Sequence, residues 1–481
     1  MPALVVGVVA GCARNPVTGR PDFVLVSRSQ EQALGAQAAE KVAATIGLVT
    51  DPELVGYVGA IGARMAADAP GGGTYQFHVA DMVEPNAFAL PGGFVYVSRG
   101  LLALANSEDE LAGVIGHEIG HVAARHAVQR ISAAAPLGIL TGIGATATGI
   151  VSPTLGGMVA GVGGTANQLV TNPYSRQQER QADEIGQELA AKGGWDPEGL
   201  PDFLHALERD EELRSGTVRS NNFFASHPST PERYADGKKR AATLTSAARA
   251  PIALDRNDLL ARLDGLVLGE DPSGGVVREQ RFLHPDLDFT LVFTDGWKIV
   301  NLPHAVQAAP TDRRASMLLV LYGQGRDPMA AAAHFAEEAQ VEYDEGPTAL
   351  RVGELAAVRA VTRLHGRGGR VTMALTWIAH AGNVFLLIGT CAPQDEDAHL
   401  RQFAATAERF RPLTARERNS IDVLRLRIVT AEPGETPAAL VARTGSIWNS
   451  KAVAVANALD QRAPMSGGQR IKIARRERYR G

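Results

Sequence analysis

The feature that most constrains the fold is a helix signal at residues 107–122 that carries two histidines. Ser107 is suited to cap the helix, and Glu110 three residues later completes a capping box. Positions four apart share one face of a helix, so His117 and His121 are expected to point the same way. Apolar residues recur near helical spacing at Leu111, Val114, Ile115, Ile119 and Val122. Two ligands do not complete a metal site, so we expect the fold to bring a third from another helix.

Residues 117–121 read His-Glu-Ile-Gly-His, which supplies the donors of a catalytic zinc site. Zinc accepts neutral imidazole nitrogens at about 2.0–2.1 Å, and its catalytic sites keep one position for water. Glu118 follows the first histidine and is placed to take a proton from that water, whose pKa the metal lowers toward ~7. The motif also arises by chance, so its weight depends on a third ligand.

A candidate third ligand lies in the segment 175–183, which again reads as helix and stops near Gly194. Glu179 and Asp183 are four residues apart and share a face. This geometry suits one metal ligand and one carboxylate that holds a ligand histidine in a single tautomer. Taken alone, such a pair is more often part of a solvated helix face. Only its combination with the two histidines favours the interpretation as part of a metal site.

These motifs, together with Glu-Pro-Asn-Ala-Phe-Ala-Leu-Pro-Gly-Gly at 84–93, resemble peptidase family M48, which includes the CaaX prenyl proteases, HtpX and BepA. The resemblance spans about residues 15–240. It implies a mainly α, zincin-like metallopeptidase domain with a small edge sheet, of the gluzincin type. It also implies that the strand Ala89–Ser98 is the edge beside which an extended protein or peptide substrate lies.

Carried over residue by residue, the resemblance implies one Zn²⁺ per chain with His117, His121 and Glu179 as ligands. Glu118 is then the catalytic base, and Asp183 is the supporting acid behind the ligands. His126 follows His121 by five residues, lies off the ligand face and is expected to be structural.

The segment 226–233 resembles the SHPxTxxR sequence of the soluble bacterial branch of this family. By that resemblance, His227 is a fourth ligand in a self-inhibited form or an oxyanion donor, and Arg233 lies near the site. Both are therefore expected to act in catalysis. The alternative for His227 is a histidine that caps a loop.

At 481 residues, the chain is longer than one hydrophobic core usually serves. Changes in composition and hydrophobic pattern along the chain predict a multidomain protein. Its parts are an export or lipoprotein signal segment (1–25), the metallopeptidase domain (26–247), an α+β domain of unknown role (255–415) and a small βααβ domain (424–475). The last region resembles a LysM domain, a fold that binds peptidoglycan-type glycans, although Pro437 departs from that pattern. Its basic end, residues 470–480, is expected to be solvated or to bind anionic surfaces.

Two stretches bear on location. Val-Ala-Gly at 9–11 leads into Cys12 and resembles a lipobox, which implies a lipid anchor at Cys12 and a protein on the periplasmic side of the bacterial envelope, at the outer membrane. The alternative is a buried N-terminal strand. Residues 131–172 are nearly uncharged and rich in Gly and Ala, and they predict a helical hairpin packed on the protein rather than inserted in a membrane.

Two functional readings remain open. The first is a zinc endopeptidase that acts on misfolded or misassembled envelope proteins. The second is a chaperone or peptidoglycan-associated binding protein whose metal site is latched by His227 or vestigial. The retention of Glu118 together with all three ligands favours the enzyme, and a net charge of -4 gives no reason to expect nucleic acid as a partner.

Overall fold

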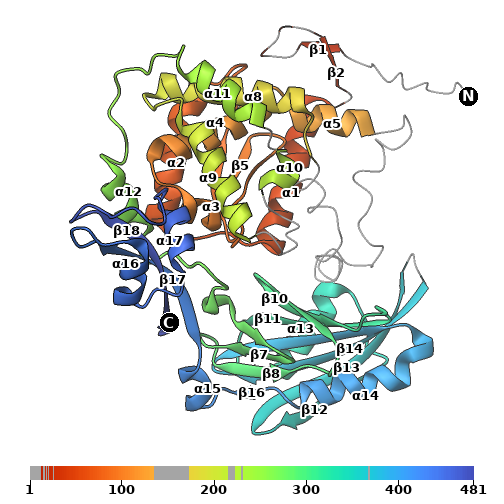
Figure 1. Cartoon of the computed structure of the whole chain (residues 1–481). Helices are drawn as coiled ribbons and strands as arrows, with labels where there is room; N and C mark the ends of the chain where they lie inside the picture. The colour runs from red at the N-terminus through yellow and green to blue at the C-terminus, as the bar shows by residue number, and fades with distance from the viewer. Residues whose placement is uncertain are drawn as a thin grey trace, which may run out of the picture. The chain divides into compact units, whose positions relative to one another are not determined.

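The chain forms two compact units (Figure 1). Among the described residues, unit 1 holds those up to 134, residues 173–269 and Leu424–Arg476, and unit 2 holds Glu270–Val423 and Glu477–Gly481. The computed structural model describes residues 12–14, 17, 19, 21–24, 26–134, 173–214, 223–228, 231–366 and 369–481. Most of the predicted signal segment, and the predicted apolar hairpin from residue 135 onward, lie outside the described residues.

Unit 1 is built mainly from helices. They are α1 (Arg28–Thr45), α2 (Pro52–Ala66), α3 (Arg99–Leu104), α4 (Glu108–Ala123), α5 (His126–Ala134), α8 (Arg176–Gly193), α9 (Gly199–Arg214), α10 (Phe223–Ser226), α11 (Pro231–Ala241) and α12 (Arg256–Leu263). Its small strands are β1 (Cys12–Arg14), β2 (Pro21–Phe23), β3 (Gln76–Ala80), β4 (Ala87–Leu90) and β5 (Phe94–Ser98). None of the helices among the described residues is long and apolar enough to cross a membrane.

Helix α4, which carries the two histidines, begins where the sequence predicts. The Ser107 hydroxyl accepts a hydrogen bond from the Glu110 backbone N–H at 3.1 Å. The Glu110 carboxylate accepts from the backbone N–H of Asn106 at 2.7 Å rather than from Ser107 itself. The cap is therefore shifted by one residue from a capping box. Nearly all of α4 is buried, so it forms the centre of the unit.

Helix α8 lies against α4 through glycines. A Cβ added at Gly186 would lie 2.6 Å from the His117 backbone nitrogen, and one added at Gly116 would lie 2.8 Å from the Gly186 carbonyl oxygen. No side chain fits at either position, so the two helices approach closely. A full capping box between Ser175 and Gln178 fixes the start of α8. This packing brings the first turn of α8 beside the histidines of α4.

The sheet of unit 1 has the strand order β3-β5-β4, with β5 parallel to β3 and antiparallel to β4. The predicted edge strand Ala89–Ser98 needs correction, because it contains a turn. Gly92 and Gly93 have positive φ angles of 81° and 97°, so the chain reverses there. Within this segment only β4 lies at an edge of the sheet, and β5 is the central strand between β3 and β4.

The C-terminal segment has the order β17 (Asp422–Thr430), α16 (Pro437–Thr444), α17 (Ser450–Ala456) and β18 (Arg470–Arg478), with β17 and β18 paired in a sheet. Thr436 caps α16, and Pro437 stands in its first turn, where proline is favoured because no N–H is needed there. Trp448 packs against both the core of this segment and the core around α4. The βααβ segment is therefore built into unit 1 (Figure 1).

Helix α12 also belongs to unit 1, whereas the sequence-based division starts the α+β domain at residue 255. The reason is packing, because Leu259 and Leu263 are fully buried in the core that surrounds α4. Unit 2 then begins at Glu270.

Unit 2 combines two antiparallel sheets with two long helices. A seven-stranded sheet has the order β12-β13-β14-β15-β11-β10-β9, and a four-stranded sheet has the order β16-β8-β7-β6. The strands are β6 (Val276–Arg278), β7 (Arg281–His284), β8 (Phe289–Val292), β9 (Lys298–Leu302), β10 (Ala305–Ala309), β11 (Ala315–Gln324), β12 (Glu345–Val352), β13 (Leu355–Gly366), β14 (Gly369–His380), β15 (Asn383–Cys391) and β16 (Arg411–Pro412). The helices are α13 (Pro328–Ala339), α14 (Glu396–Ala407) and the short α15 (Ala415–Asn419). This is an α+β arrangement whose described residues form two large hydrophobic cores, one around Phe289 and Phe410 and one around Phe335 and Trp377, and a smaller one around Leu283 and Ile421.

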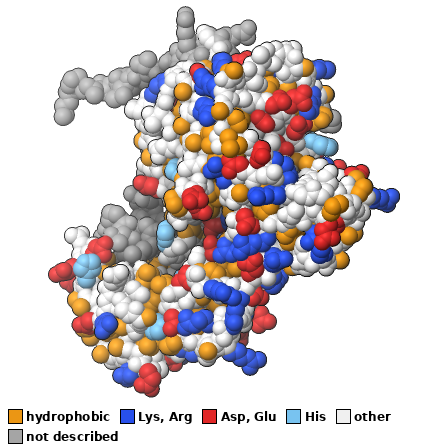
Figure 2. All heavy atoms as spheres, turned by 90° about the vertical axis from the view of Figure 1, so that its left-hand side faces the viewer, with side chains coloured by type: hydrophobic (Ala, Val, Ile, Leu, Met, Phe, Trp, Pro, Cys, Tyr) orange, Lys and Arg blue, Asp and Glu red, His pale blue; other side chains and the backbone are white. Residues whose placement is uncertain are grey.

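Charged side chains of both signs are interspersed over the face that Figure 2 shows. This mixture agrees with the small net charge of -4.

Candidate metal centre

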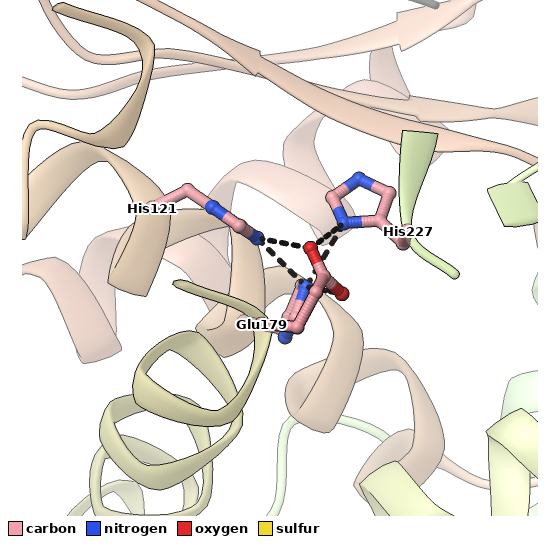
Figure 3. A group of neighbouring side chains, drawn as sticks. His121, Glu179 and His227 are labelled. Carbon is pink, nitrogen blue, oxygen red and sulfur yellow. Dashed lines mark hydrogen bonds and ion pairs between the residues drawn. The ribbon is translucent and has the colours of Figure 1, made fainter. Parts of the chain in front are cut away.

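Four side chains from three parts of unit 1 converge at one point (Figure 3). His117 and His121 come from α4, Glu179 from the first turn of α8, and His227 directly follows α10. One ligand atom of each lies within 4.8 Å of the ligand atoms of the others, and all four residues are buried. The structure therefore brings together the three predicted ligands and the predicted fourth residue.

The distances between these atoms suit a tetrahedral ion. Ligand atoms bound to zinc at about 2.0–2.1 Å lie about 3.3 Å from one another. His121 Nε2 lies 3.0 Å from His117 Nε2 and 3.3 Å from Glu179 Oε1. His227 Nδ1 lies 3.2 Å from His117 Nε2 and 3.0 Å from Glu179 Oε1. Three imidazole nitrogens and a carboxylate oxygen aimed at one point fit a cation that binds nitrogen and oxygen donors.

The electrostatics favour the ligand protonation states of His121 and Glu179, whereas at His117 burial lowers the pKa but Asp183 outweighs it and raises that pKa. Burial lowers the pKa of His121 well below its usual value, against the opposing effect of Glu179, so the ring is neutral. Burial alone would raise the pKa of Glu179, but His227 and His121 outweigh it and hold that pKa well below the usual range. Neutral imidazole and ionised carboxylate are the ligand forms of these residues.

The hydrogen bonding of the buried Glu118 carboxylate is incomplete among the described residues. Its side chain is fully buried, and neither carboxylate oxygen has a hydrogen-bond partner among the described residues. The nearest charged group is His227, whose Nε2 lies 3.5 Å from Glu118 Oε1. Burial raises the pKa of Glu118, while His227 and His117 oppose the rise. Since buried polar atoms are nearly always paired, this carboxylate fits a site that receives a water molecule beside an ion.

Asp183 and Arg233 contact the predicted ligands His117 and Glu179 through atoms outside the donor set. His117 Nδ1 lies 2.9 Å from Asp183 Oδ1. The Arg233 guanidinium donates to both oxygens of Asp183 at 2.9 and 2.8 Å, and its Nη1 lies 2.8 Å from Glu179 Oε2. His117 and Arg233 hold the pKa of Asp183 below its usual value although burial opposes them. Arg233 is thus engaged with two carboxylates, and its ionic contacts orient the residues that surround the site.

The charges of this buried group also fit a divalent cation. Glu118, Glu179 and Asp183 are three acids, and Arg233 is the one cation among the side chains described above. When the acids are ionised and the histidines neutral, one divalent ion balances the charge. Uncompensated buried charge is costly. The donor atoms and the net charge of the side chains around them therefore both indicate a divalent cation.

The segment that carries His227 is held on two sides. Phe223 N–H donates to the Pro85 carbonyl at 3.2 Å, just before β4, and Tyr174 N–H donates to the Ser226 carbonyl at 3.0 Å, just before α8. The ring of Phe223 stacks on that of His227 with centroids 4.4 Å apart. His227 is therefore fixed in the site by its neighbours and not only by the other donors.

His126 contributes a contact that sequence analysis did not predict. Helix α4 ends at Ala123, and the chain turns at Arg125, whose φ is 58°, before α5 begins at His126. The turn brings His126 Nδ1 to 2.9 Å from His121 Nδ1, on the side of the ring that faces away from the cluster. The expectation that His126 lies off the ligand face assumes a continuous helix, and the sequence carries no glycine or proline to signal the break.

Comparison with known proteins agrees with this geometry. Residues 54–241, which include the whole cluster, match Peptidase family M48. The Beta-barrel assembly-enhancing protease of Escherichia coli (strain K12) is 29% identical over 250 residues, which cover 50% of this chain and 50% of that protein. Metalloprotease LoiP of the same strain is 30% identical over 164 residues, covering 33% of this chain and 59% of that protein.

A eukaryotic relative shows the same likeness over a shorter stretch. Mitochondrial metalloendopeptidase OMA1 of Schizosaccharomyces pombe is 30% identical over 159 residues, covering 33% of this chain and 44% of that protein. The chain spans about half the length of the beta-barrel assembly-enhancing proteases that it matches. Residues 54–241 are thus similar to Peptidase family M48, and the described cluster lies within that match.

Proposed function

We propose that the chain is a zinc-dependent endopeptidase in which His117, His121 and Glu179 bind the metal and Glu118 is the general base. The observation that carries this proposal is the buried Glu118 carboxylate, without a hydrogen-bond partner among the described residues, beside four convergent donor atoms. A bound zinc ion supplies Lewis acidity, which makes water nucleophilic at neutral pH.

Glu118 is the residue that moves protons. One of its carboxylate oxygens takes a proton from the attacking water and later delivers it to the nitrogen of the leaving amine. Its raised pKa brings the carboxyl closer to the working pH, which favours both transfers. Asp183 holds the His117 proton on Nδ1, so that Nε2 keeps its lone pair for the metal. The edge strand β4 would pair with an extended peptide backbone, which suits many protein substrates.

We propose further that the described conformation is latched by His227. Catalytic zinc sites keep one position open, whereas four protein donors close the site. His227 Nδ1 is the fourth donor here, so it must leave before water and a substrate carbonyl can enter. The alternative is a chaperone or peptidoglycan-associated binding protein whose site stays latched or is vestigial.

The setting of this activity is proposed from the relatives and from the sequence. Relatives named for enhancing β-barrel assembly support a role in protein quality control at the bacterial envelope. Lipidation at Cys12 would place the chain on the periplasmic side of a membrane. Labelling with fatty acid in cells tests this placement. We expect the wild-type chain to take up the label and the Cys12→Ser chain not to.

The C-terminal βααβ segment is proposed to be a LysM-like module for peptidoglycan. Its element order supports the likeness. Co-sedimentation of the whole chain with purified peptidoglycan tests this role, and a chain that stays in the supernatant contradicts it.

The decisive experiment measures zinc content and casein cleavage for the wild-type chain, Glu118→Gln, His227→Ala and the control His205→Ala, whose side chain is 57% exposed on α9. We expect about one zinc per chain in all four and cleavage in every protein except Glu118→Gln. If wild type and His227→Ala both bind zinc and neither cleaves, the binding-protein alternative holds. If wild type does not bind zinc, the central proposal is wrong.

A further inference from the structure

Each of the two histidines on α4 has an outer ring nitrogen, and the structure gives these two nitrogens different partners. The outer nitrogen of His117 lies beside the carboxylate of Asp183 at 2.9 Å. The outer nitrogen of His121 lies 2.9 Å from Nδ1 of another imidazole, that of His126. The far side of that second ring, Nε2 of His126, lies 3.0 Å from Oε1 of Gln181 on α8. A chain of polar contacts thus runs from His121 through His126 to Gln181.

The chemistry of these groups allows one arrangement of protons along the chain when both rings are neutral. His121 Nε2 faces Glu179 and His117 in the cluster, so it must keep its lone pair to bind a metal. The proton of His121 is then on Nδ1, which donates to Nδ1 of His126. His126 consequently carries its own proton on Nε2, which donates to the amide oxygen of Gln181, a pure acceptor.

His126 is held firmly in this position. Arg125, just before it, adopts the left-handed conformation with φ 58°, which non-glycine residues enter at some cost. The Arg125 guanidinium compensates by pairing with Glu31 at 2.7 Å and by donating to the Val26 carbonyl at 3.2 Å. His126 itself is fully buried. The turn is thus fixed independently of any metal.

A second contact orients the same ring. Tyr174 stacks on His121 with ring centroids 3.9 Å apart, and the guanidinium of Arg130 lies 4.4 Å from the centroid of the Tyr174 ring. Tyr174 fixes the plane of the His121 ring but cannot choose its tautomer. The choice of tautomer falls to His126.

The neutral character of this support matters for the charge of the site. Glu118, Glu179 and Asp183 already bring three acids, and Arg233 pairs with two of them. A carboxylate behind His121, like the one behind His117, would add a further buried negative charge. An imidazole that ends on an amide gives the same hydrogen bond without that charge.

We propose that His126 is a positioning residue that sets the tautomer and orientation of His121 for metal binding, with Gln181 fixing the tautomer of His126 in turn. The inference rests on the proposed zinc site, and it adds a residue outside the donor set. Outer partners of metal-bound histidines typically change metal affinity by about 10–100-fold. His126 is expected to act in that range.

The test compares His126→Asn with His126→Leu in the whole chain. The two side chains have nearly the same size, but the oxygen of Asn can accept the proton of His121 Nδ1 and Leu cannot. Zinc affinity is measured by competition with a chromophoric chelator, and thermal unfolding of the metal-free proteins reports on folding. We expect His126→Leu to lose about 10–100-fold in zinc affinity and His126→Asn to lose less than about threefold.

A packing role predicts the opposite order, since Leu fills a buried site better than Asn. Equal zinc affinities, or weaker binding by the Asn variant, therefore overturn the proposal. If both variants unfold, Gln181→Leu decides, because it removes the acceptor of the His126 Nε2 proton without adding a charge: weaker zinc binding supports the proposal, and unchanged binding overturns it. A wild-type chain that binds no zinc would refute the proposed function itself, whereas normal wild-type binding with equal variants refutes only the role of His126.

Discussion

His227 and Glu118 face each other across the candidate metal centre, with Nε2 of the histidine 3.5 Å from Oε1 of the glutamate. The fourth donor of the cluster therefore occupies the side from which the proposed general base would work. A single movement of His227 would open a position for water and uncover Glu118 together. This relationship couples access to the site with the readiness of its base.

Replacing His227 by Ala is expected to raise peptide cleavage. The fraction of open molecules limits the activity of a latched enzyme, so removal of the latch raises the rate by the reciprocal of that fraction, on the order of tenfold if a tenth of the molecules are open. Initial rates on a quenched fluorescent peptide at saturating zinc measure the change. A rate that falls by more than about tenfold would instead assign His227 to catalysis, as an oxyanion donor.

Asp183→Asn is expected to weaken zinc binding by about 10–100-fold, because the amide can present its N–H₂ to His117 and no longer fixes one tautomer. Arg233 would also lose one of its two carboxylate partners. Chelator competition measures the affinity, and Glu188→Gln, an exposed change on the same helix, is the matched control. Unchanged affinity in Asp183→Asn would mean that the aspartate serves folding alone.

Gly186→Ala is expected to destabilise unit 1 by about 1–3 kcal/mol, since the new methyl group meets the backbone of the neighbouring helix. Its Cβ would lie 2.6 Å from the His117 nitrogen. The matched control is Gly56→Ala in α2, where nothing lies within 4 Å of the new Cβ. That change should stabilise the helix by about 0.5–1 kcal/mol. Urea denaturation measures both, and equal effects would contradict the close approach of α4 and α8.

Lys472 predicts a pH dependence of stability. Its side chain is fully buried, and Nζ donates to the carbonyls of Ala103, Leu104 and Ala105 at 3.0, 2.9 and 2.7 Å. Burial lowers its pKa to about 7 from the usual 10.5. Between these pH values the unfolded chain holds a proton that the folded chain lacks, so this residue's contribution to stability rises with pH across that window.

The comparison with Lys472→Met isolates this effect. The free energy of unfolding of wild type minus that of the variant should increase by up to about 2–3 kcal/mol from pH 7 to pH 9, at about 1.4 kcal/mol per pH unit. Chemical denaturation at the two pH values measures it. A difference that stays constant would show that the three carbonyls keep the lysine charged throughout.

The sequence predicts the donors better than their surroundings. Helical spacing is a local property, so the sequence alone predicts that His117 and His121 share one face of a helix. In the structure their Nε2 atoms lie 3.0 Å apart. The family resemblance adds Glu179 and His227, which no local pattern would join to them. The position of His126 depends on a helix end at Ala123 that no glycine or proline announces, and on a turn held by Glu31 from a distant helix.

The C-terminal segment illustrates the same limit. Residues 470–480 carry many charges, and a charged run is usually solvated, yet Lys472 is fully buried. Its burial depends on carbonyls at the end of α3, far away in the sequence, which no local pattern reveals. The prediction of a small βααβ domain at 424–475 likewise carries no sign that Trp448 packs against the core around α4.

The insertion of unit 2 into unit 1 has a consequence for the timing of synthesis. The carbonyls of Ala103, Leu104 and Ala105 lie at the end of α3, just before α4, and they receive their partner Lys472 only after unit 2 up to Val423 has been synthesised. A growing or truncated chain therefore holds the histidines and the glutamates of the site long before the support of that helix is complete.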